Sequence, residues 1–206
     1  MAIDLKSHLS PPSTAVLCME MQRGVVGDLS PIEPLVHAVA NRGVVPQLAR
    51  LIAAARNAGV QIAYCNALHR ADRKGSATNC PMLARSAKAD GMIEGTPDVE
   101  IVPELAARRE DIVSGRYHGM SPFTGTSLDI TLRNLGIRTV VATGVSLNVG
   151  LIAMCAEAVA LGYRVVIPRD CVAGVPDEYA EAVLRNTMPV LASVVHSDEL
   201  LAVWES

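Results

Sequence analysis

Residues 144–151 read GVSLNVGL and form the junction between one apolar run and the next. In a β/α protein such a junction lies at the carboxyl edge of a parallel sheet, where ligands bind. It carries the hydroxyl of Ser146 and the amide of Asn148, whereas Gly150 has no side chain. We therefore expect a ligand to lie against Ser146, Val149 and Gly150, at a site without a nucleophile of its own.

Glu20 is the ionisable residue best placed for chemistry near this junction. It closes the apolar run C-M-E-M-Q, so its carboxyl group is expected at the same edge, in poorly solvated surroundings. Such surroundings favour the protonated carboxyl, which can act as a general acid at neutral pH. The alternative is a structural glutamate that pairs with a nearby arginine, and the run itself does not decide between the two.

Neither a metal site nor a nucleotide site is indicated. His69 has no second histidine or aspartate at the spacing that a metal requires. Gly144 and Gly150 lack the G-x-G-x-x-G spacing, and there is no P-loop motif. Cys155 lies in the middle of an apolar segment, where a thiol packs rather than reacts. We therefore expect no cofactor and no metal ion.

The composition indicates one cytoplasmic domain that associates with copies of itself. The chain has 206 residues, enough for a single α/β domain over 1–206. Hydrophobic residues make up 50% and charged residues only 19%, so a homo-oligomer, dimeric or higher, is expected to cover part of the surface. The cysteines form no CxxC pair, and the N-terminus shows no leader pattern.

The net charge and the hydropathy of the chain limit the kinds of partner that it is expected to bind. A net charge of −3 gives no electrostatic basis for binding nucleic acid, so a small-molecule substrate is the expected partner. The run 139–156 carries no charge, but Gly144, Ser146 and Asn148 break it into a strand and a helix. We therefore expect no association with a membrane.

Short apolar runs alternate with helical patterns, which predicts a three-layer α/β/α fold around a six-stranded, mainly parallel sheet. The predicted strands cover residues 15–20, 61–66, 112–115, 139–144, 164–168 and 192–196. Helix ends are signalled by Pro46, Gly59, Thr126 or Ser127, Asp177 and Pro189. The segment 149–161 is apolar on every side, so we expect it to be covered by the sheet and by a further element, such as a second subunit.

Two stretches, 23–34 and 68–97, show no regular pattern. Both follow predicted strands at the ligand edge of the sheet, so we expect them to form the walls of a pocket. The second stretch contains Arg70, Arg73 and Asn79, which are suited to holding an acid. Asn79 is therefore a candidate substrate-binding residue, and an anionic substrate is expected.

Three motifs together resemble those of the isochorismatase-like hydrolases. They are C-M-E-M-Q, R-Y-H-G-M-S-P-F-T-G-T-S-L and G-V-S-L-N-V-G, and their order and spacing match the family over residues 13–200. The family's own motifs run D-x-Q, then K-x-x-x-S-x-F-x-G-T-x-L, then G-V-x-T-x-x-C. The resemblance implies that Gln22, His118 and Phe123 lie near the substrate. It also implies a cis peptide bond between Val145 and Ser146.

The family's three catalytic positions hold different residues in this chain. Glu20 stands where the family has Asp, Arg116 or Tyr117 where it has Lys, and Gly150 where it has the nucleophilic Cys. Amide cleavage by a thiolate therefore does not carry over. One branch, the isochorismatases proper, also has Gly at the last position and hydrolyses a vinyl ether by protonating it with the strand-one carboxylic acid. In this chain Gly150 either makes room for a cyclic substrate or marks a site no longer in use.

The resemblance thus implies a hydrolase that acts on a small organic anion by acid catalysis from Glu20. The alternative is an inactive relative that binds a metabolite or serves as a structural oligomeric protein. A hydrolase that recruits Cys18 or Cys155 is disfavoured, since neither thiol is expected at the pocket edge. The position of Arg116 separates the first two: on the substrate it would assist catalysis, whereas paired with Glu20 it favours the inactive relative.

Overall fold

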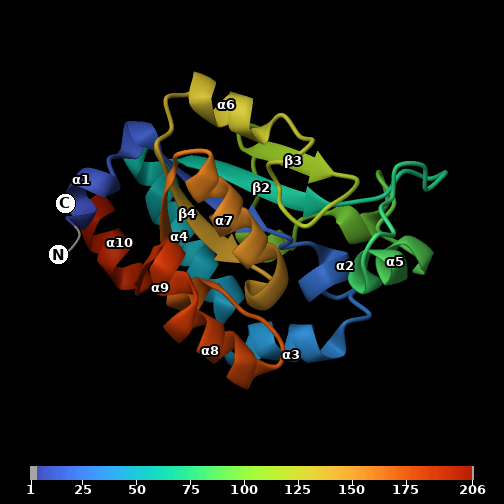
Figure 1. The fold of residues 1–206 in the computed structure, drawn as a ribbon. Coiled ribbons are helices and arrows are strands. Elements are labelled where there is room, and N and C mark those ends of the chain that lie inside the picture. The colour runs from blue at the N-terminus through green and yellow to red at the C-terminus, as the bar shows by residue number, and fades with distance from the viewer. Residues whose placement is uncertain (1–3, 206) are drawn as a thin grey trace.

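The computed structural model describes residues 4–205. Residues 1–3 and 206, the ends of the expected 1–206 domain, lie outside the described residues, as does the start of the segment examined for a leader. A six-stranded sheet in the order β3-β2-β1-β4-β5-β6 forms the centre (Figure 1). Every pairing between neighbouring strands is parallel, where the sequence predicts a mainly parallel sheet.

Each predicted strand overlaps a strand of the structure, with ends that agree to within one or two residues. The strands are β1 (Thr14–Met19), β2 (Gln61–Ala67), β3 (Ile112–Arg116), β4 (Thr139–Gly144), β5 (Arg164–Pro168) and β6 (Ser193–Val195). The two central strands, β1 and β4, are buried at every position. A strand covered on both faces needs no polar alternation, which is why these two strands appear in the sequence as continuous apolar runs.

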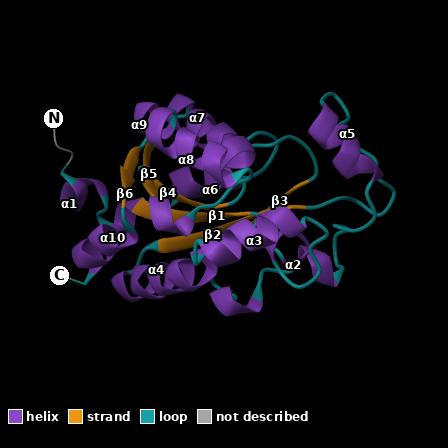
Figure 2. Ribbon diagram, turned by 90° about the horizontal axis from the view of Figure 1, so that it is seen from below, coloured by secondary structure: helices purple, strands orange, loops and turns teal. Residues whose placement is uncertain are grey.

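Helices cover both faces of the sheet (Figure 2). On one face, α3 (Glu33–Asn41), α4 (Val44–Ala58) and α10 (Ser197–Trp204) form a core with β1 side chains such as Val16 and Cys18. On the other face lie α6 (Leu128–Asn134), α7 (Ile152–Ala160), α8 (Asp177–Asn186) and α9 (Met188–Leu191). Leu17 and Met19 of β1 point into this second core, so consecutive β1 residues serve opposite layers.

The predicted helix signals are found at the expected positions. Pro46 lies in the first turn of α4, and Gly59 follows its end with φ of +81°, a left-handed cap that favours glycine. The hydroxyl of Thr126 accepts a hydrogen bond from the N–H of Leu128, so Thr126 rather than Ser127 caps α6 with its side chain. The α8 helix ends before Pro189, which starts the short α9.

The prediction that 23–34 and 68–97 lack regular structure is wrong in part. The first stretch contains α2 (Arg23–Val26), and the second contains α5 (Pro81–Lys88). Pro81 stands at the start of α5, where a missing N–H costs nothing, and good helix formers follow it. A further short helix, α1 (Leu5–His8), precedes the first strand.

The apolar segment 149–161 is only half covered. Met154, Cys155 and Ala158 of α7 are buried against the sheet, whereas Ala156 and Val159 are exposed. The chain itself therefore leaves the outer side of α7 uncovered, and coverage by a second subunit stays a prediction. Among the described residues, no helix combines the length and the apolar character needed to cross a membrane.

Candidate active site

The carboxyl ends of β1, β3 and β4 bring three predicted residues to one edge of the sheet. Glu20 follows β1, Arg116 ends β3, and Gly150 lies just beyond β4. Parallel register aligns these ends, because Met19 lies opposite Gly144 and Ala67 lies opposite Arg116. Positions 20 and 116 thereby meet across β2 although 96 positions separate them along the chain.

Glu20 has a backbone conformation that a non-glycine residue rarely adopts. Its φ is +51°, in the left-handed region, and its N–H donates to the carbonyl of Cys65 at 3.0 Å. The side chain is 19% exposed, so its carboxylate is mostly but not fully removed from water. Residues held in this region gather at functional sites, because only a surrounding structure that fixes them can offset about 1–3 kcal/mol of strain.

Arg116 pairs directly with Glu20. Its Nη2 donates to Glu20 Oε1, its Nε donates to the carbonyl of Gly119 at 3.2 Å, and its Nη1 lies 4.0 Å from Met19 Sδ. The side chain is only 6% exposed. The guanidinium is therefore already satisfied by protein groups, with no ligand needed to pair with it.

Tyr117, the other candidate for the cationic position, points elsewhere. Its hydroxyl donates to Glu94 Oε2 at 2.8 Å, and this hydrogen bond raises the pKa of Tyr117. Of the two residues that the sequence leaves open, Arg116 is therefore the one that reaches Glu20.

Gly150 lies in a π-helical turn, Leu147–Leu151, which leads into α7. The N–H of Leu151 reaches back to the carbonyl of Ser146 at 3.1 Å, five residues away. A Cβ added to Gly150 would lie 2.9 Å from Met19 Cε, closer than real Cβ contacts allow. The side chain of Met19 therefore occupies the space that Gly150 leaves.

The polar side chains of this turn bond within the protein. The hydroxyl of Ser146 lies 2.9 Å from Asn148 Oδ1, and Asn148 Nδ2 donates to the carbonyl of Val175 at 2.9 Å. The N–H of Val149 donates to the carbonyl of Ser146 at 3.0 Å. The peptide bond between Val145 and Ser146 is cis, as the resemblance implies.

Four further candidates form no hydrogen bond with the ion pair among the described residues. The Gln22 amide bonds only to backbone, donating to Ala67 and Val99 and accepting from the N–H of Ala67, so it joins β2 to a loop. The ring of Phe123 stacks on Tyr163 with centroids 5.9 Å apart.

The other two of these four lie in loops. His118 lies over Gly125, as the clash of an added Cβ there shows, and Asn79 is exposed. None of the hydrogen bonds found among residues 4–205 joins Gln22, Phe123, His118 or Asn79 to Glu20 or Arg116. A role of these four residues in binding substrate stays a prediction.

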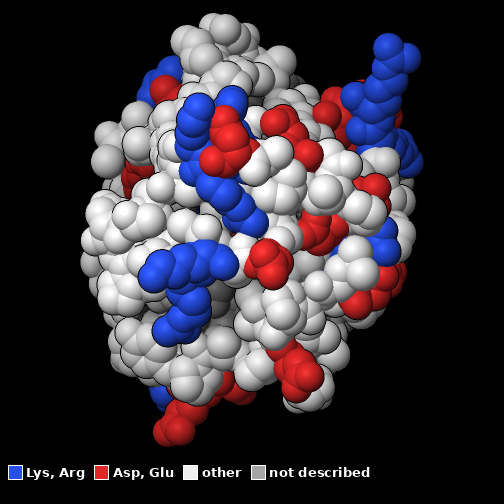
Figure 3. Space-filling view, turned by 90° about the vertical axis from the view of Figure 1, so that its right-hand side faces the viewer, with Lys and Arg blue, Asp and Glu red and all other residues white. Residues whose placement is uncertain are grey.

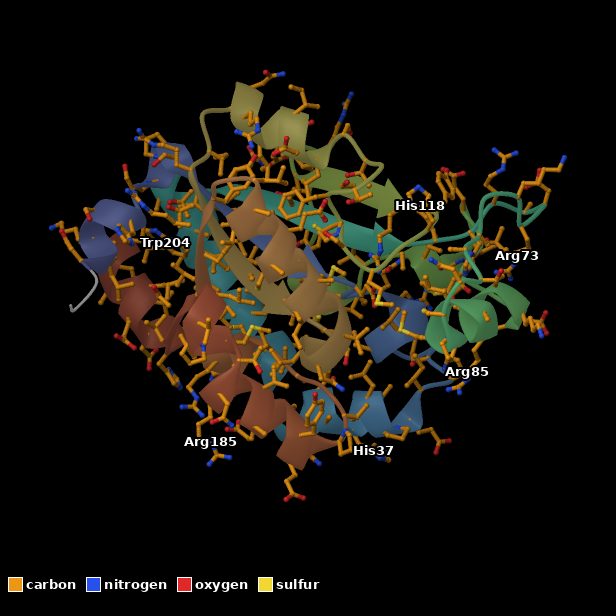
Figure 4. All side chains as sticks on the ribbon, in the orientation of Figure 1. His37, Arg73, Arg85, His118, Arg185 and Trp204 are labelled. Carbon is orange, nitrogen blue, oxygen red and sulfur yellow. The ribbon has the colours of Figure 1, made fainter. Side chains whose placement is uncertain are left out.

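The basic residues of 68–97 are also bonded within their own loop. Arg73 Nη2 donates to the carbonyls of Ala89 and Gly91 at 2.8 Å and 3.0 Å, and Arg70 pairs with Asp72. Figure 4 places Arg73 at the far end of the molecule from Trp204. Arg70 and Arg73 are expected from the sequence to hold an acid. In the structure both form contacts within their own loop.

The thiols are not activated. Burial raises the pKa of Cys18 to about 12, and burial raises the pKa of Cys155 to about 12. Cys65 is a residue that the sequence reasoning missed: it lies opposite Met19 in β2, close enough for Arg116 and Glu20 to influence it. Burial raises the pKa of Cys65 as well, so it is a packed thiol beside the pair.

Charged side chains of both signs are mixed on the surface near α5. Figure 3 shows basic and acidic side chains interspersed on the face that includes α5. Within 4–205, no group of three or more His, Cys, Asp or Glu side chains is arranged to hold a metal ion. One surface hollow of about 490 Å³ lies between α3 and the start of α8, where His37 and Asp177 face it, and Glu20, Arg116 and Gly150 do not line it.

The all-parallel sheet with helices on both faces defines a three-layer α/β protein, with a Glu–Arg pair at the carboxyl edge of its sheet. Residues 14–199 match the isochorismatase domain. The chain therefore belongs to the isochorismatase family of hydrolases.

Individual relatives agree with this assignment. The uncharacterized isochorismatase family protein YwoC of Bacillus subtilis is 29% identical over 189 residues, which is 91% of this chain and 92% of that one. Nicotinamidase 3 of Arabidopsis thaliana is 28% identical over 148 residues, 70% and 71% of the two chains. A cysteine hydrolase from Pseudomonas syringae has the same fold, with a TM-score of 0.82 at 22% identity over 96% of this chain and 95% of the other.

Proposed function

We propose that this chain is an isochorismatase-family hydrolase that acts on a small organic anion without a cysteine nucleophile, in the manner of the family branch with Gly at this position. The observation that carries the proposal is that Glu20, held in a left-handed backbone conformation, lies with Arg116 at the carboxyl edge of the sheet beside Gly150; the direct pairing of the two side chains by itself favours the inactive relative. A carboxyl group, a fixed cation and no nucleophile suit proton transfer rather than covalent catalysis. The left-handed φ of Glu20 supports a retained functional role.

The mechanism needs the ion pair to open. In the resting state Arg116 donates to Glu20, so neither side chain is free to engage a substrate. An anionic group on the substrate offers the guanidinium an alternative bidentate partner, because Arg binds carboxylates in this way. Glu20 then loses its counter-charge in a mostly buried place, takes up a proton, and delivers it to the substrate.

The reaction class follows from this sequence of events. Protonation of the alkene carbon of a vinyl ether by Glu20 gives an oxocarbenium ion. Water adds to this ion and returns a proton to Glu20, and the resulting hemiketal breaks its C–O bond to give a carbonyl product and an alcohol, so no covalent bond to the protein is needed. No residue contributes a thiolate, and the proposal includes no metal ion and no cofactor. The enzyme would work in the cytoplasm as a homo-oligomer.

A second candidate function is favoured if the Glu20–Arg116 pair stays closed, as it is in the structure. Arg116 is already satisfied by Glu20, and Met19 already fills the space beside Gly150. A protein in which neither group is released would bind a metabolite elsewhere or serve as a structural subunit, without turnover.

One experiment separates the two. Vinyl ethers such as isochorismate, followed by small amides, are incubated with the wild type, with Glu20→Gln, and with wild type whose accessible thiols are blocked. We expect Glu20→Gln to lower the rate about 10²- to 10⁴-fold, the usual effect of losing a general acid. The exposed Glu178→Gln is the matched control and should keep full activity.

Two further readings complete the test. Blocking thiols and removing metals with a chelator should each leave the rate unchanged. Turnover that depends on thiols and not on Glu20 would reject the mechanism. Absence of turnover across the whole panel would support the inactive relative instead.

A further inference from the structure

We propose that Met19 is the specificity-determining side chain of this site, and that a ligand reaches Gly150 and the Glu20–Arg116 pair only by displacing the end of the Met19 side chain. The inference deepens the proposed function, because it states what limits the size of the substrate. It rests on the location of that site, but it does not require turnover.

Met19 fills the space that the missing side chain of Gly150 leaves. A Cβ at position 150 would lie 2.9 Å from Met19 Cε and 3.8 Å from Met19 Cγ. Met19 itself is fully buried. Gly150 therefore does not by itself make room for a cyclic substrate, because the thioether already lies there.

The same side chain also covers the cation. Met19 Sδ lies 4.0 Å from Arg116 Nη1, so one flexible group lies against both Arg116 and Gly150. Glu20, the next residue along the chain, completes the enclosure from the other side of the guanidinium.

Only the side chain of Met19 is free to move. Its strand pairs on both sides, with Cys65 of β2 and Gly144 of β4 opposite it, and its carbonyl accepts from the N–H of Val145 at 3.0 Å. Methionine is unbranched and has three side-chain torsions, so it can change shape while the backbone stays fixed. A buried methionine with a fixed backbone can therefore fill the site until a ligand displaces its side chain.

The class of ligand follows from the volume that the Met19 side chain leaves when it rotates. Rotation of Met19 frees the volume of a short thioether next to a guanidinium whose charge is met by Glu20. A carboxylate joined to a short, unbranched apolar group fits that volume and charge.

A reporter thiol at position 150 tests this access directly. The background is Cys80→Ser, since Cys80 is the one thiol among the described residues that is not buried. Gly150→Cys is introduced with and without Met19→Ala, and alkylation by iodoacetamide is followed by mass spectrometry. We expect the Met19→Ala variant to react at least about tenfold faster, because reaction requires an accessible thiol.

Met188→Ala provides the matched control. Met188 is a fully buried methionine of the same core cluster, but it is not among the nearest atoms to position 150. It should leave the reaction rate of Gly150→Cys unchanged. Equal rates with and without Met19→Ala would overturn the proposal, as would an equal acceleration by Met188→Ala.

A second measurement serves if the reporter variant does not fold. Methionine methyl groups are labelled with ¹³C, and Gly150→Ala is compared with the wild type. The added methyl should shift the Met19 signal more than that of Met188, and an unchanged Met19 signal would overturn the proposal. Because neither measurement uses a substrate, a failure here leaves the proposed reaction standing, and a lack of turnover leaves this inference standing.

Discussion

The guanidinium of Arg116 donates directly to the carboxylate of Glu20, across a strand that separates them in the sheet. Both side chains are largely removed from water, with 6% and 19% exposed. Removing one member of such a pair leaves the other without its counter-charge in a poorly solvated place. The pair therefore has a stability role that is measurable apart from any catalytic role.

A double-mutant cycle measures that role. Glu20→Gln and Arg116→Met should each lower the free energy of unfolding by about 1–3 kcal/mol, less than for a fully buried pair. The double variant should lose less than the sum of the two, which leaves a coupling of at least about 1 kcal/mol. Urea denaturation followed by circular dichroism provides the values.

The exposed pair Arg50–Asp198 is the control for this cycle. Its side chains are 58% and 62% exposed, so its coupling should stay below about 0.5 kcal/mol. Equal coupling for the two pairs would show that Glu20 and Arg116 do not interact as the structure has them.

The strands and the meeting of Glu20, Arg116 and Gly150 are predictable from the sequence. Continuous apolar runs identify buried parallel strands, and the carboxyl ends of such strands necessarily share an edge. The partner of Arg116 was not predictable, since a guanidinium at that edge reaches a substrate and a carboxylate equally well. Only the positions of both side chains decide it.

Met19 and Gln22 show what lies beyond the sequence pattern. In the run C-M-E-M-Q, Met19 counts as one more core residue, and nothing local indicates that its methyl reaches position 150. Gln22 resembles a ligand-binding residue, but its amide bonds are all with backbone that loops bring to it. The positions of both side chains depend on contacts between segments that are distant along the chain, and no local sequence pattern indicates such contacts.

Gly144 should tolerate no side chain. Its φ is +94°, and an added Cβ would overlap the carbonyl oxygen of Met19 on the neighbouring strand. Gly144→Ala should therefore lower stability by about 3 kcal/mol or more, since strain and a backbone clash add. Chemical denaturation measures the loss.

Gly162 separates the contribution of the left-handed conformation from that of the backbone clash. Its φ is +89°, but nothing lies within 4 Å of an added Cβ. Gly162→Ala should cost only about 1–2 kcal/mol, the cost of the left-handed conformation itself. Similar losses at 144 and 162 would show that the close approach of β1 to Gly144 is not as the structure has it.

Cys80 should be the first thiol to react in the folded protein. The other four described cysteines are buried, and burial raises the pKa of Cys18 and of Cys155 to about 12. Titration with a thiol reagent at pH 8 should therefore modify one equivalent rapidly, and all five only after unfolding. Cys80→Ser should abolish the rapid phase, and a rapid phase that persists in this variant would contradict the burial of the others.

The outer side of α7 is the surface on which self-association is expected. Val159 is 43% exposed there and lies next to exposed alanines, where the sequence favours a covered helix. Sedimentation velocity at micromolar concentration should show at least a dimer, and Val159→Glu should shift it toward the 21.8 kDa monomer. Ile130→Glu on α6 is the control, and a wild-type monomer would contradict the prediction.

Acidification should loosen the segment that contains His69. The ring nitrogens of His69 lie 2.9 Å and 3.1 Å from the hydroxyls of Ser76 and Ser86, and burial together with nearby Arg73 lowers the pKa of His69. A neutral ring accepts from one serine and donates to the other, whereas a protonated ring has no acceptor left. Proton uptake therefore requires the serine that donates to the ring to turn its hydroxyl and accept instead.

The sign of the pH dependence follows from that lowered pKa. The unfolded chain takes up this proton near its ordinary value of about 6.5, before the folded protein does, so folding is opposed as the pH falls through that window. The stabilisation is fully present above pH 6.5 and is lost on acidification, with a slope below about 1.4 kcal/mol per pH unit. Urea midpoints at pH 7.5 and pH 5.5 should therefore differ more for the wild type than for His69→Gln. The exposed His37→Gln should keep the wild-type difference, and an equal difference in all three proteins would show that His69 does not carry it.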